Sequence, residues 1–315
     1  MRRVRAAVIL SVAVLVAGVA LVVVGVVRGR STTRADAAWT VPTTTAASAA
    51  PVGECPGPWD CAFSARLAAA SALVAAKPGR LGIAVRDRVS GAIWRAGEPE
   101  HPVWTASTIK LAMAADLLER ARVGALTLDA TARQQIADML DFSSNSAADR
   151  LWRRFELADR VQHYRDVYGI SGLEFPAGYR YWGAMKCTTD GLLGLMSYVL
   201  DHLAPADRDY IVGAMRTVDR VQQWGVWAAG RPQRPGLKAG WSIEKDPGGE
   251  HWVANSVGFA GPDARYAVAV MYQLPPGVNT RNGSIRAGVQ AISDIVATIF
   301  GAPVPAPVTV PPKDL

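Results

Sequence analysis

Apolar and polar residues change their spacing along this chain and divide it into strands, then helices, then strands again. Ile109, Met113 and Leu117 recur at the spacing of one helical face, whereas residues 265–274 alternate with a period of two. Helices are expected over residues 62–76, 107–122, 131–140, 145–155, 189–202, 205–215 and 284–300. Strands are expected over residues 81–85, 92–94, 236–243, 252–260 and 265–274. Early and late strands that join one antiparallel sheet, with helices inserted between them, predict an α+β fold.

The first 30 residues combine a basic end with a long apolar stretch. Residues 6–27 carry no charge and have arginines on both sides. As a helix they would span about 33 Å, enough to cross a bilayer core, whereas the apolar region of a cleavable signal peptide is usually shorter. We therefore expect residues 1–30 to form a cytoplasmic basic end and a transmembrane anchor. The sequence Ala35-Asp36-Ala37 resembles a cleavage site, which leaves open a secreted form.

The remaining chain divides by composition. Residues 31–54 are rich in Thr, Ala and Pro and lack periodicity, which is typical of a flexible linker. Residues 303–315 contain five prolines and are expected to form a disordered tail. We find no repeat and no second linker between these segments, so residues 55–302 are expected to form one domain.

The net charge of +7 does not indicate nucleic-acid binding. Six arginines and no acidic residue fall within residues 1–34, and the rest of the chain carries 28 basic and 27 acidic residues. A protein that neutralises many phosphates needs a basic face, and this distribution offers none.

Three cysteines leave their pairing open. Cys55 and Cys61 bracket a short loop, and beyond a membrane anchor a disulfide between them is plausible. Their spacing does not match the common zinc motifs. Cys187 stands alone, and it remains an alternative partner for either of them, as do three free thiols.

The sequence Ser107-Thr108-Ile109-Lys110 places a nucleophile and a base one helical turn apart. Only six of the 34 basic residues are lysines, so a lysine here is notable. A buried lysine can release its proton, whereas an arginine cannot. Such a pair suits nucleophilic catalysis by Ser107 with Lys110 as the base.

Two further motifs follow in order, Ser143-Ser144-Asn145 and Lys238-Ala239-Gly240. Together with Ser107–Lys110 they resemble the S-x-x-K, S-x-N and K-x-G series of the class A β-lactamases and penicillin-binding proteins. The resemblance covers about residues 62–300. It implies an antiparallel sheet packed by N- and C-terminal helices, with an inserted all-helical region, and a domain on the extracytoplasmic side of the membrane.

The resemblance also implies roles for individual residues. Ser107 would be acylated, Lys110 would accept its proton, and Ser143 would relay a proton to the leaving nitrogen. Lys238 would lower the pKa of Lys110 and face a substrate carboxylate. These four are the catalytic candidates.

The substrate-binding candidates are Asn145, Gly240, Trp241 and Ser242. Asn145 would hold the substrate amide, and Ser242 would face the carboxylate. The backbone N–H groups of Ser107 and Trp241, which follows Gly240, would form an oxyanion hole. The resemblance implies no cofactor and no metal.

Three departures limit the activity that we expect. Ser144 replaces the central aspartate of S-D-N, and Ala239 removes a hydroxyl that helps to bind the substrate carboxylate. The deacylating glutamate of class A enzymes has no clear counterpart. Glu174, the only acidic residue in the right region, is a candidate for that base, and an ordinary loop acid is the favoured alternative. Without that base, an acyl-enzyme at Ser107 would hydrolyse slowly.

Three functions stay open at this point. The favoured one is a membrane-anchored serine hydrolase acylated by β-lactams or cell-wall-like peptides. The alternative is a catalytically impaired protein of the same fold that binds cell-wall fragments or an envelope partner. In the third, the serines and Asn145 are helix caps and turn residues, Lys238 is a solvated strand residue, and the chain is an envelope scaffold.

Overall fold

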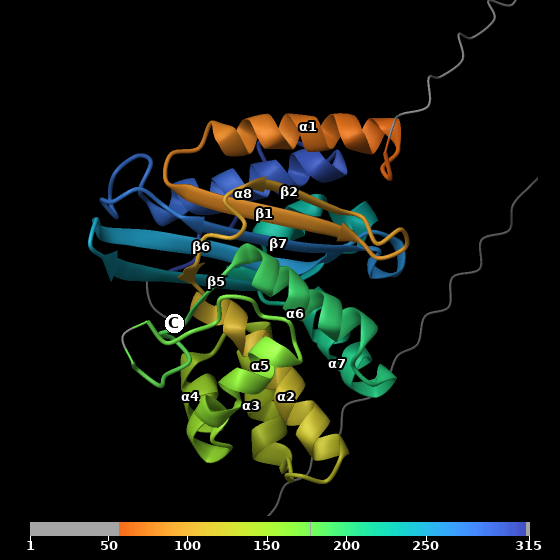
Figure 1. The fold of residues 1–315 in the computed structure, drawn as a ribbon, viewed down its shortest axis with the longest axis vertical. Coiled ribbons are helices and arrows are strands. Elements are labelled where there is room, and N and C mark those ends of the chain that lie inside the picture. The colour runs from red at the N-terminus through yellow and green to blue at the C-terminus, as the bar shows by residue number, and fades with distance from the viewer. Residues whose placement is uncertain (1–56, 177, 313–315) are drawn as a thin grey trace, which may run out of the picture. The chain divides into compact units, whose positions relative to one another are not determined.

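A computed structural model describes residues 57–176 and 178–312, which fold around a five-stranded antiparallel sheet (Figure 1). The strands are β1 (Arg80–Asp87), β2 (Ile93–Gly97), β5 (Gly236–Asp246), β6 (Gly249–Ala260) and β7 (Tyr266–Gln273). They lie in the order β2-β1-β7-β6-β5, so two early strands pair with three late ones. In register, Ile83 of β1 faces Val270 of β7. This topology confirms the predicted α+β class.

Two helices from opposite ends of the domain cover one face of the sheet, α1 (Cys61–Ala75) and α8 (Ile285–Phe300) (Figure 1). Each begins at a capping side chain: Asp60 accepts a hydrogen bond from the N–H of Phe63, and Ser284 from that of Ala287. Such caps stabilise a helix by about 1 kcal/mol each. The two helices pack against each other over the sheet, as the resemblance predicted.

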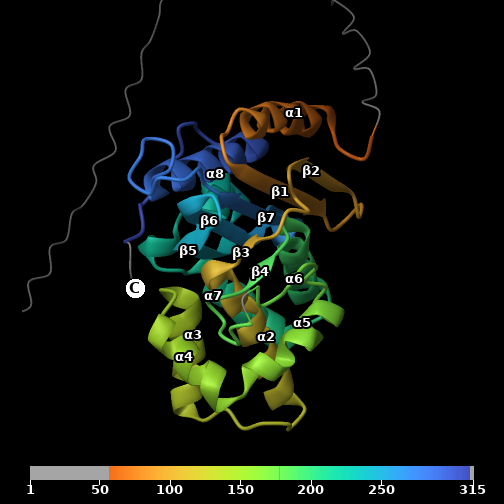
Figure 2. The same ribbon diagram turned by 60° about the vertical axis from the view of Figure 1, so that its left-hand side comes forward.

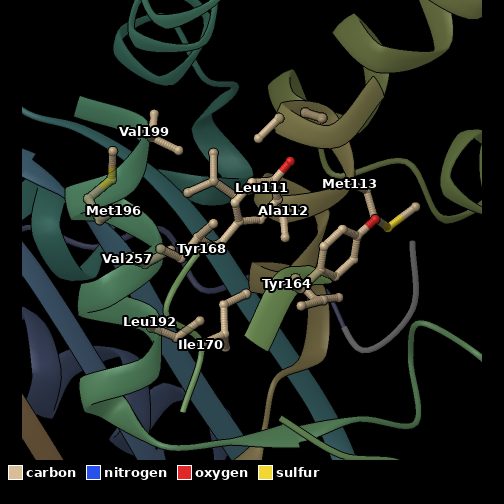
Figure 3. Packing of buried hydrophobic residues seen from close by; sticks show 14 of the residues in the cluster. Leu111, Ala112, Met113, Tyr164, Tyr168, Ile170, Leu192, Met196, Val199 and Val257 are labelled. Carbon is tan, nitrogen blue, oxygen red and sulfur yellow. The ribbon is translucent and has the colours of Figure 1, made fainter. Parts of the chain in front are cut away.

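The other face carries a helical region (Figures 1 and 2). Its helices are α2 (Lys110–Arg122), α3 (Ala130–Asp141), α4 (Asn145–Arg154), α5 (Val161–Asp166), α6 (Thr189–Asp201) and α7 (Pro205–Arg216). Leu111, Ala112 and Met113 of α2 are all fully buried, which means that this helix is covered on every side. Figure 3 shows side chains of α2 and α6 gathered with Tyr164 and Tyr168 in one cluster. The nucleophile helix is therefore held in the interior of the domain.

Several short elements were not predicted because they are too short to show a period. A two-stranded sheet joins β3 (Val103–Trp104) to β4 (Lys186–Cys187). The 3₁₀ turns are η1 (Ala106–Ile109), η2 (Leu157–Arg160), η3 (Arg220–Gln222), η4 (Gly225–Ala229), η5 (Arg231–Gln233) and η6 (Pro262–Ala264). The β3–β4 pair matters most, because it leads directly into η1 and the nucleophile.

The prediction of a disordered tail is wrong for residues 303–312, which pack back onto the domain. The backbone N–H of Ala306 donates to Asp294 of α8 at 2.8 Å, and Ala306 is buried. The indole nitrogen of Trp241 donates to the carbonyl oxygen of Pro312 at 2.9 Å. Prolines lack a backbone donor but keep the carbonyl acceptor, so neighbouring side chains can hold such a segment without a strand or helix.

The predicted anchor (1–30) and linker (31–54) lie outside the described residues, and so does Cys55. Among residues 57–176 and 178–312, no helix combines the length and apolar character needed to cross a membrane. Cys61 is disulfide-bonded, whereas Cys187 is free and buried. The predicted pairing of Cys55 with Cys61 is compatible with these two findings.

Candidate active site

Ser107 lies in η1, immediately before α2, at the rim of a cavity of about 570 Å³. The preceding residue, Ala106, has a φ of +46°, an uncommon conformation for a residue with a Cβ atom. Strained backbone of this kind often accompanies functional positions. The side chain of Ser107 is largely shielded but lines the cavity, so a ligand in the cavity can reach its hydroxyl.

Lys110 is fully buried one turn after Ser107. Its Nζ donates to the carbonyl oxygen of Ser143 at 2.6 Å and to Oδ1 of Asn145 at 2.7 Å. The same nitrogen lies 4.4 Å from the ring centre of Trp182. Burial lowers the pKa of Lys110 to about 7, although the charge of Asp149 raises it. A substantial fraction of Lys110 is therefore neutral at neutral pH, as a proton acceptor must be.

Ser143 joins the first motif to the third. Its hydroxyl oxygen lies 2.9 Å from Nζ of Lys238 and 3.4 Å from Nζ of Lys110. Ser143 has a φ of +66° and is fully buried between α3 and α4. Lys238 is also fully buried, and burial together with the nearby Lys110 holds its pKa well below the usual range. The structure thus brings together the two lysines and the serine that the motifs predicted, although they are far apart in sequence.

In the second motif, Ser144 caps a helix and Asn145 lines the cavity. Ser144 is the N-cap of α4 and accepts a hydrogen bond from the N–H of Ala147 at 3.2 Å. Serine and aspartate are about equally good caps, so replacing the aspartate of S-D-N preserves this local role. Asn145 is the first residue of α4 and lines the cavity with its side chain bound to Lys110. The cap fixes the helix end that presents Asn145.

Gly240 allows β5 to approach the nucleophile. A Cβ atom at this position would lie 2.9 Å from the backbone nitrogen of Ser107 and 2.8 Å from that of Thr108, closer than real Cβ atoms come. Trp241 and Ser242 follow Gly240 and line the cavity. The backbone at Ser107 and the start of β5 therefore lie side by side, the arrangement that an oxyanion hole between Ser107 and Trp241 requires.

Gln222 is a site residue that sequence reasoning missed. It is fully buried, and its Nε2 donates to the carbonyl oxygen of Leu140 at 2.7 Å. Its Oε1 accepts from Nζ of Lys238 and, at 3.1 Å, from the N–H of Ala239. Gln222 thus ties the end of α3 to β5 and positions Lys238. No local motif marks it, because its partners lie 16 or more residues away.

Sequence analysis also did not predict that two aromatic side chains form a wall of this cavity. Tyr181 and Trp182 line the cavity, and both donate to Oδ1 of Asp149, at 3.0 and 2.8 Å. Because Asp149 lies one turn after Asn145 on α4, this contact fixes Trp182 over Lys110. The indole is thus part of the side-chain layer that covers Lys110.

Comparisons with known proteins agree with this geometry. Residues 65–141, which include the Ser107–Lys110 motif and η1, match the β-lactamase enzyme family. Solved class A structures superpose closely: a reconstructed ancestral enzyme of Gram-negative bacteria has a TM-score of 0.57 at 19% identity and covers 76% of this chain and 99% of its own. A β-lactamase from Chitinophaga pinensis has a TM-score of 0.60 at 15% identity, covering 75% of this chain and 98% of its own. The described residues thus share the fold of the class A β-lactamases, and residues 65–141 resemble the β-lactamase enzyme family.

A curated protein is also similar to this chain in sequence. LppW of Mycobacterium tuberculosis is 28% identical over 231 residues, which cover 69% of this chain and 71% of LppW. Its name assigns it provisionally to the lipoproteins. LppW of Mycobacterium bovis matches equally well.

Glu174 has no place in the site of this β-lactamase-like protein. Its backbone pairs with that of Lys186, its side chain is exposed, and it is absent from the described residues that line the cavity. The expectation that Glu174 acts as a base therefore gains no support from the geometry. Across residues 57–176 and 178–312, no group of three His, Cys, Asp or Glu side chains is arranged to hold a metal ion.

Proposed function

We propose that this chain is an envelope-attached serine hydrolase that forms an acyl-enzyme at Ser107 with β-lactams or cell-wall-like peptides and releases it slowly. The observation that carries the proposal is the convergence of Lys110 and Lys238 on the hydroxyl of Ser143, together with a cavity of about 570 Å³ that is lined by Ser107 and by Asn145, the partner of Lys110. A structural role alone would not require two buried lysines at one hydroxyl, since burying cations is costly.

Acylation would proceed by ordinary proton and acyl transfer. Neutral Lys110 would take the proton of Ser107 while the serine oxygen attacks the substrate carbonyl carbon. The N–H groups of Ser107 and Trp241 would stabilise the negative charge on the carbonyl oxygen. Ser143, in contact with both lysines, would give its hydroxyl proton to the leaving nitrogen as the C–N bond breaks and would take the proton held by Lys110 in its place, leaving an ester on Ser107 and Lys110 neutral again.

Substrate binding would use the cavity walls. Asn145 would hold the substrate amide, while Ser242 and Lys238 would face its carboxylate. Ala239 contributes no hydroxyl to that carboxylate, and it is fully buried. We therefore expect weaker ground-state binding of carboxylate-bearing substrates than a threonine at this position would give.

Deacylation would be slow because the ester must be attacked by water, and water needs a base. The aromatic side chains of Tyr181 and Trp182 line the cavity, with Trp182 over Lys110, whereas Glu174 is exposed and does not line it. Asp149, which lies outside the cavity lining, already accepts hydrogen bonds from both aromatic residues. An acyl group on Ser107 would consequently persist.

Attachment to the membrane is part of the proposal. The uncharged stretch 6–27 would be the single-pass anchor, and residues 31–54 the linker to a domain beginning near residue 55. The provisional lipoprotein name of LppW fits a location at the cell envelope. Exposure of the domain outside the cytoplasm also suits the disulfide at Cys61.

A second candidate function is a non-catalytic protein that binds cell-wall fragments or an envelope partner. It is favoured by one observation: no side chain within the described residues hydrogen-bonds the hydroxyl of Ser107, and Lys110 is instead bound to Ser143 and Asn145. Catalytic hydrogen bonds often form only when substrate is present, so this geometry is compatible with both candidates.

Labelling with a fluorescent penicillin separates the two. Membranes carrying the full chain are incubated with the probe and analysed on a denaturing gel. We expect a labelled band for the wild type and for Ser90→Ala, whose serine lies in an exposed loop, but none for Ser107→Ala. A wild type that stays unlabelled yet binds cell-wall peptides would support the non-catalytic candidate.

A further inference from the structure

A second cavity, of about 640 Å³, lies away from Ser107 between the end of α7, η4, η5 and the C-terminal segment. Its apolar wall is formed by Trp227, Pro235, Ala302, Pro303 and Pro307. These residues surround an open hollow that the packed tail helps to build. Two tail prolines, Pro303 and Pro307, therefore form part of a cavity wall, which the composition of the tail alone does not predict.

The opposite wall is cationic. Arg216, Arg231 and Arg234 line the same cavity, and no acidic residue of the described chain does. None of the three guanidinium groups has a hydrogen bond or ion pair within the described residues. This sets them apart from arginines such as Arg265 and Arg160, which pair with aspartates at 2.7 Å.

Arg216 is the least solvated of the three. Its Nε is buried without a hydrogen-bond partner, and its guanidinium lies 5.2 Å from the ring centre of Phe259. Burial and the charge of Arg234 lower the pKa of Arg216, and Asp263 only partly offsets this. A desolvated cation beside other unpaired cations costs free energy that a bound anion would recover.

We propose that this cavity binds a small amphiphilic anion, in which a carboxylate, sulfonate or phosphate is joined to an aromatic or branched aliphatic body. The anionic group pairs with Arg216, Arg231 and Arg234, and the apolar body packs on Trp227 and the tail prolines. Guanidinium groups suit this role because they bind such oxyanions in a planar, two-bonded geometry. The ligand can be a soluble metabolite or the headgroup region of an anionic lipid, which share this chemistry.

The test uses the full chain in phosphatidylcholine nanodiscs and equilibrium dialysis with naphthalene-2-sulfonate, corrected for uptake by empty discs. Neutral 2-naphthalenemethanol and inorganic sulfate are the matched probes. We expect saturable binding of the sulfonate about tenfold tighter than of either probe, since both the charge and the apolar body contribute. Equal binding of the neutral probe, equal binding of sulfate, or no binding at millimolar concentration overturns the proposal.

Two double variants locate the site. Arg231→Gln with Arg234→Gln changes exposed residues and should weaken sulfonate binding about tenfold. Arg133→Gln with Arg220→Gln, a control that removes the same charge from exposed positions outside the cavity, should leave the affinity unchanged. Equal effects of the two pairs would overturn the assignment. Phosphatidylglycerol in the discs distinguishes the sources: it competes with the sulfonate in the wild type if the natural ligand is a lipid, and does not if the ligand is soluble.

Discussion

Nζ of Lys238 lies 2.9 Å from the hydroxyl oxygen of Ser143, and Nζ of Lys110 lies 3.4 Å from the same oxygen. Burial lowers the pKa of both lysines, and Lys110 lowers that of Lys238 further. Two interacting amines at one buried hydroxyl titrate as a pair, so we expect them to hold fewer than two protons at neutral pH. This gives the site a proton acceptor without any histidine.

The first prediction concerns pH. If neutral Lys110 is the base, the rate of adduct formation rises with pH, because the amine loses its proton, and levels off above its pKa of about 7. Stopped-flow measurement of acylation by a chromogenic cephalosporin across this range gives the profile. A rate that falls as pH rises through 7 would show that protonated Lys110 is the active form.

The second prediction concerns Asp149 and the pH dependence of the acylation rate. Its charge raises the pKa of Lys110, so Asp149→Asn should move the rising limb of the acylation rate to lower pH. The substituted amide keeps an oxygen that can accept from Trp182, so the aromatic wall is retained. Glu156→Gln, at an exposed position, is the matched charge control and should leave the limb in place. A shift to higher pH in the Asp149 variant contradicts the account.

Gly240→Ala tests the approach of β5 to the nucleophile. The added methyl group would lie 2.9 Å from the backbone nitrogen of Ser107, so either β5 or η1 must shift. We expect acylation to slow about 100-fold or more, the usual effect of losing an oxyanion donor. Gly248→Ala, in the turn of the same hairpin, meets no atom within 4 Å and should acylate normally. Equal rates for the two variants would mean that this close approach is not needed.

Lys238→Met separates catalysis from stability. The lysine is fully buried, so an apolar side chain of similar length removes a desolvated amine, which offsets the hydrogen bonds lost at Ser143 and Gln222, and the melting temperature should change little. Acylation should nevertheless fall about 100-fold or more, because Ser143 loses a partner in proton transfer. A variant that is both unstable and fully active would assign Lys238 a structural role only.

Local patterns predicted most of this fold and much of the site. Helical and alternating spacings placed the long helices and the five strands, because apolar residues recur along each with the period of its backbone. The order of the three motifs predicted that their residues share one site, and the structure brings Lys110, Ser143 and Lys238 into contact. The short β3–β4 pair shows no period and was beyond such reasoning.

The rest depends on contacts between segments distant in sequence. Gln222 is polar and lies in a 3₁₀ turn, and only the fold reveals that it joins α3 to Lys238. Trp182 was one of ten scattered tryptophans until its position over Lys110 was known. The proline-rich tail was expected to be disordered because proline disfavours regular structure, yet its carbonyl oxygens find donors such as Trp241.

Intact-mass spectrometry of the full chain during reaction with benzylpenicillin tests the central claim most directly. The account predicts that one penicilloyl group is added to the wild type and none to Ser107→Ala, and that the adduct persists long after free penicillin is removed. Absence of any adduct, with penicillin left intact, would contradict acylation at Ser107. Rapid hydrolysis of penicillin without a lasting adduct would contradict slow deacylation.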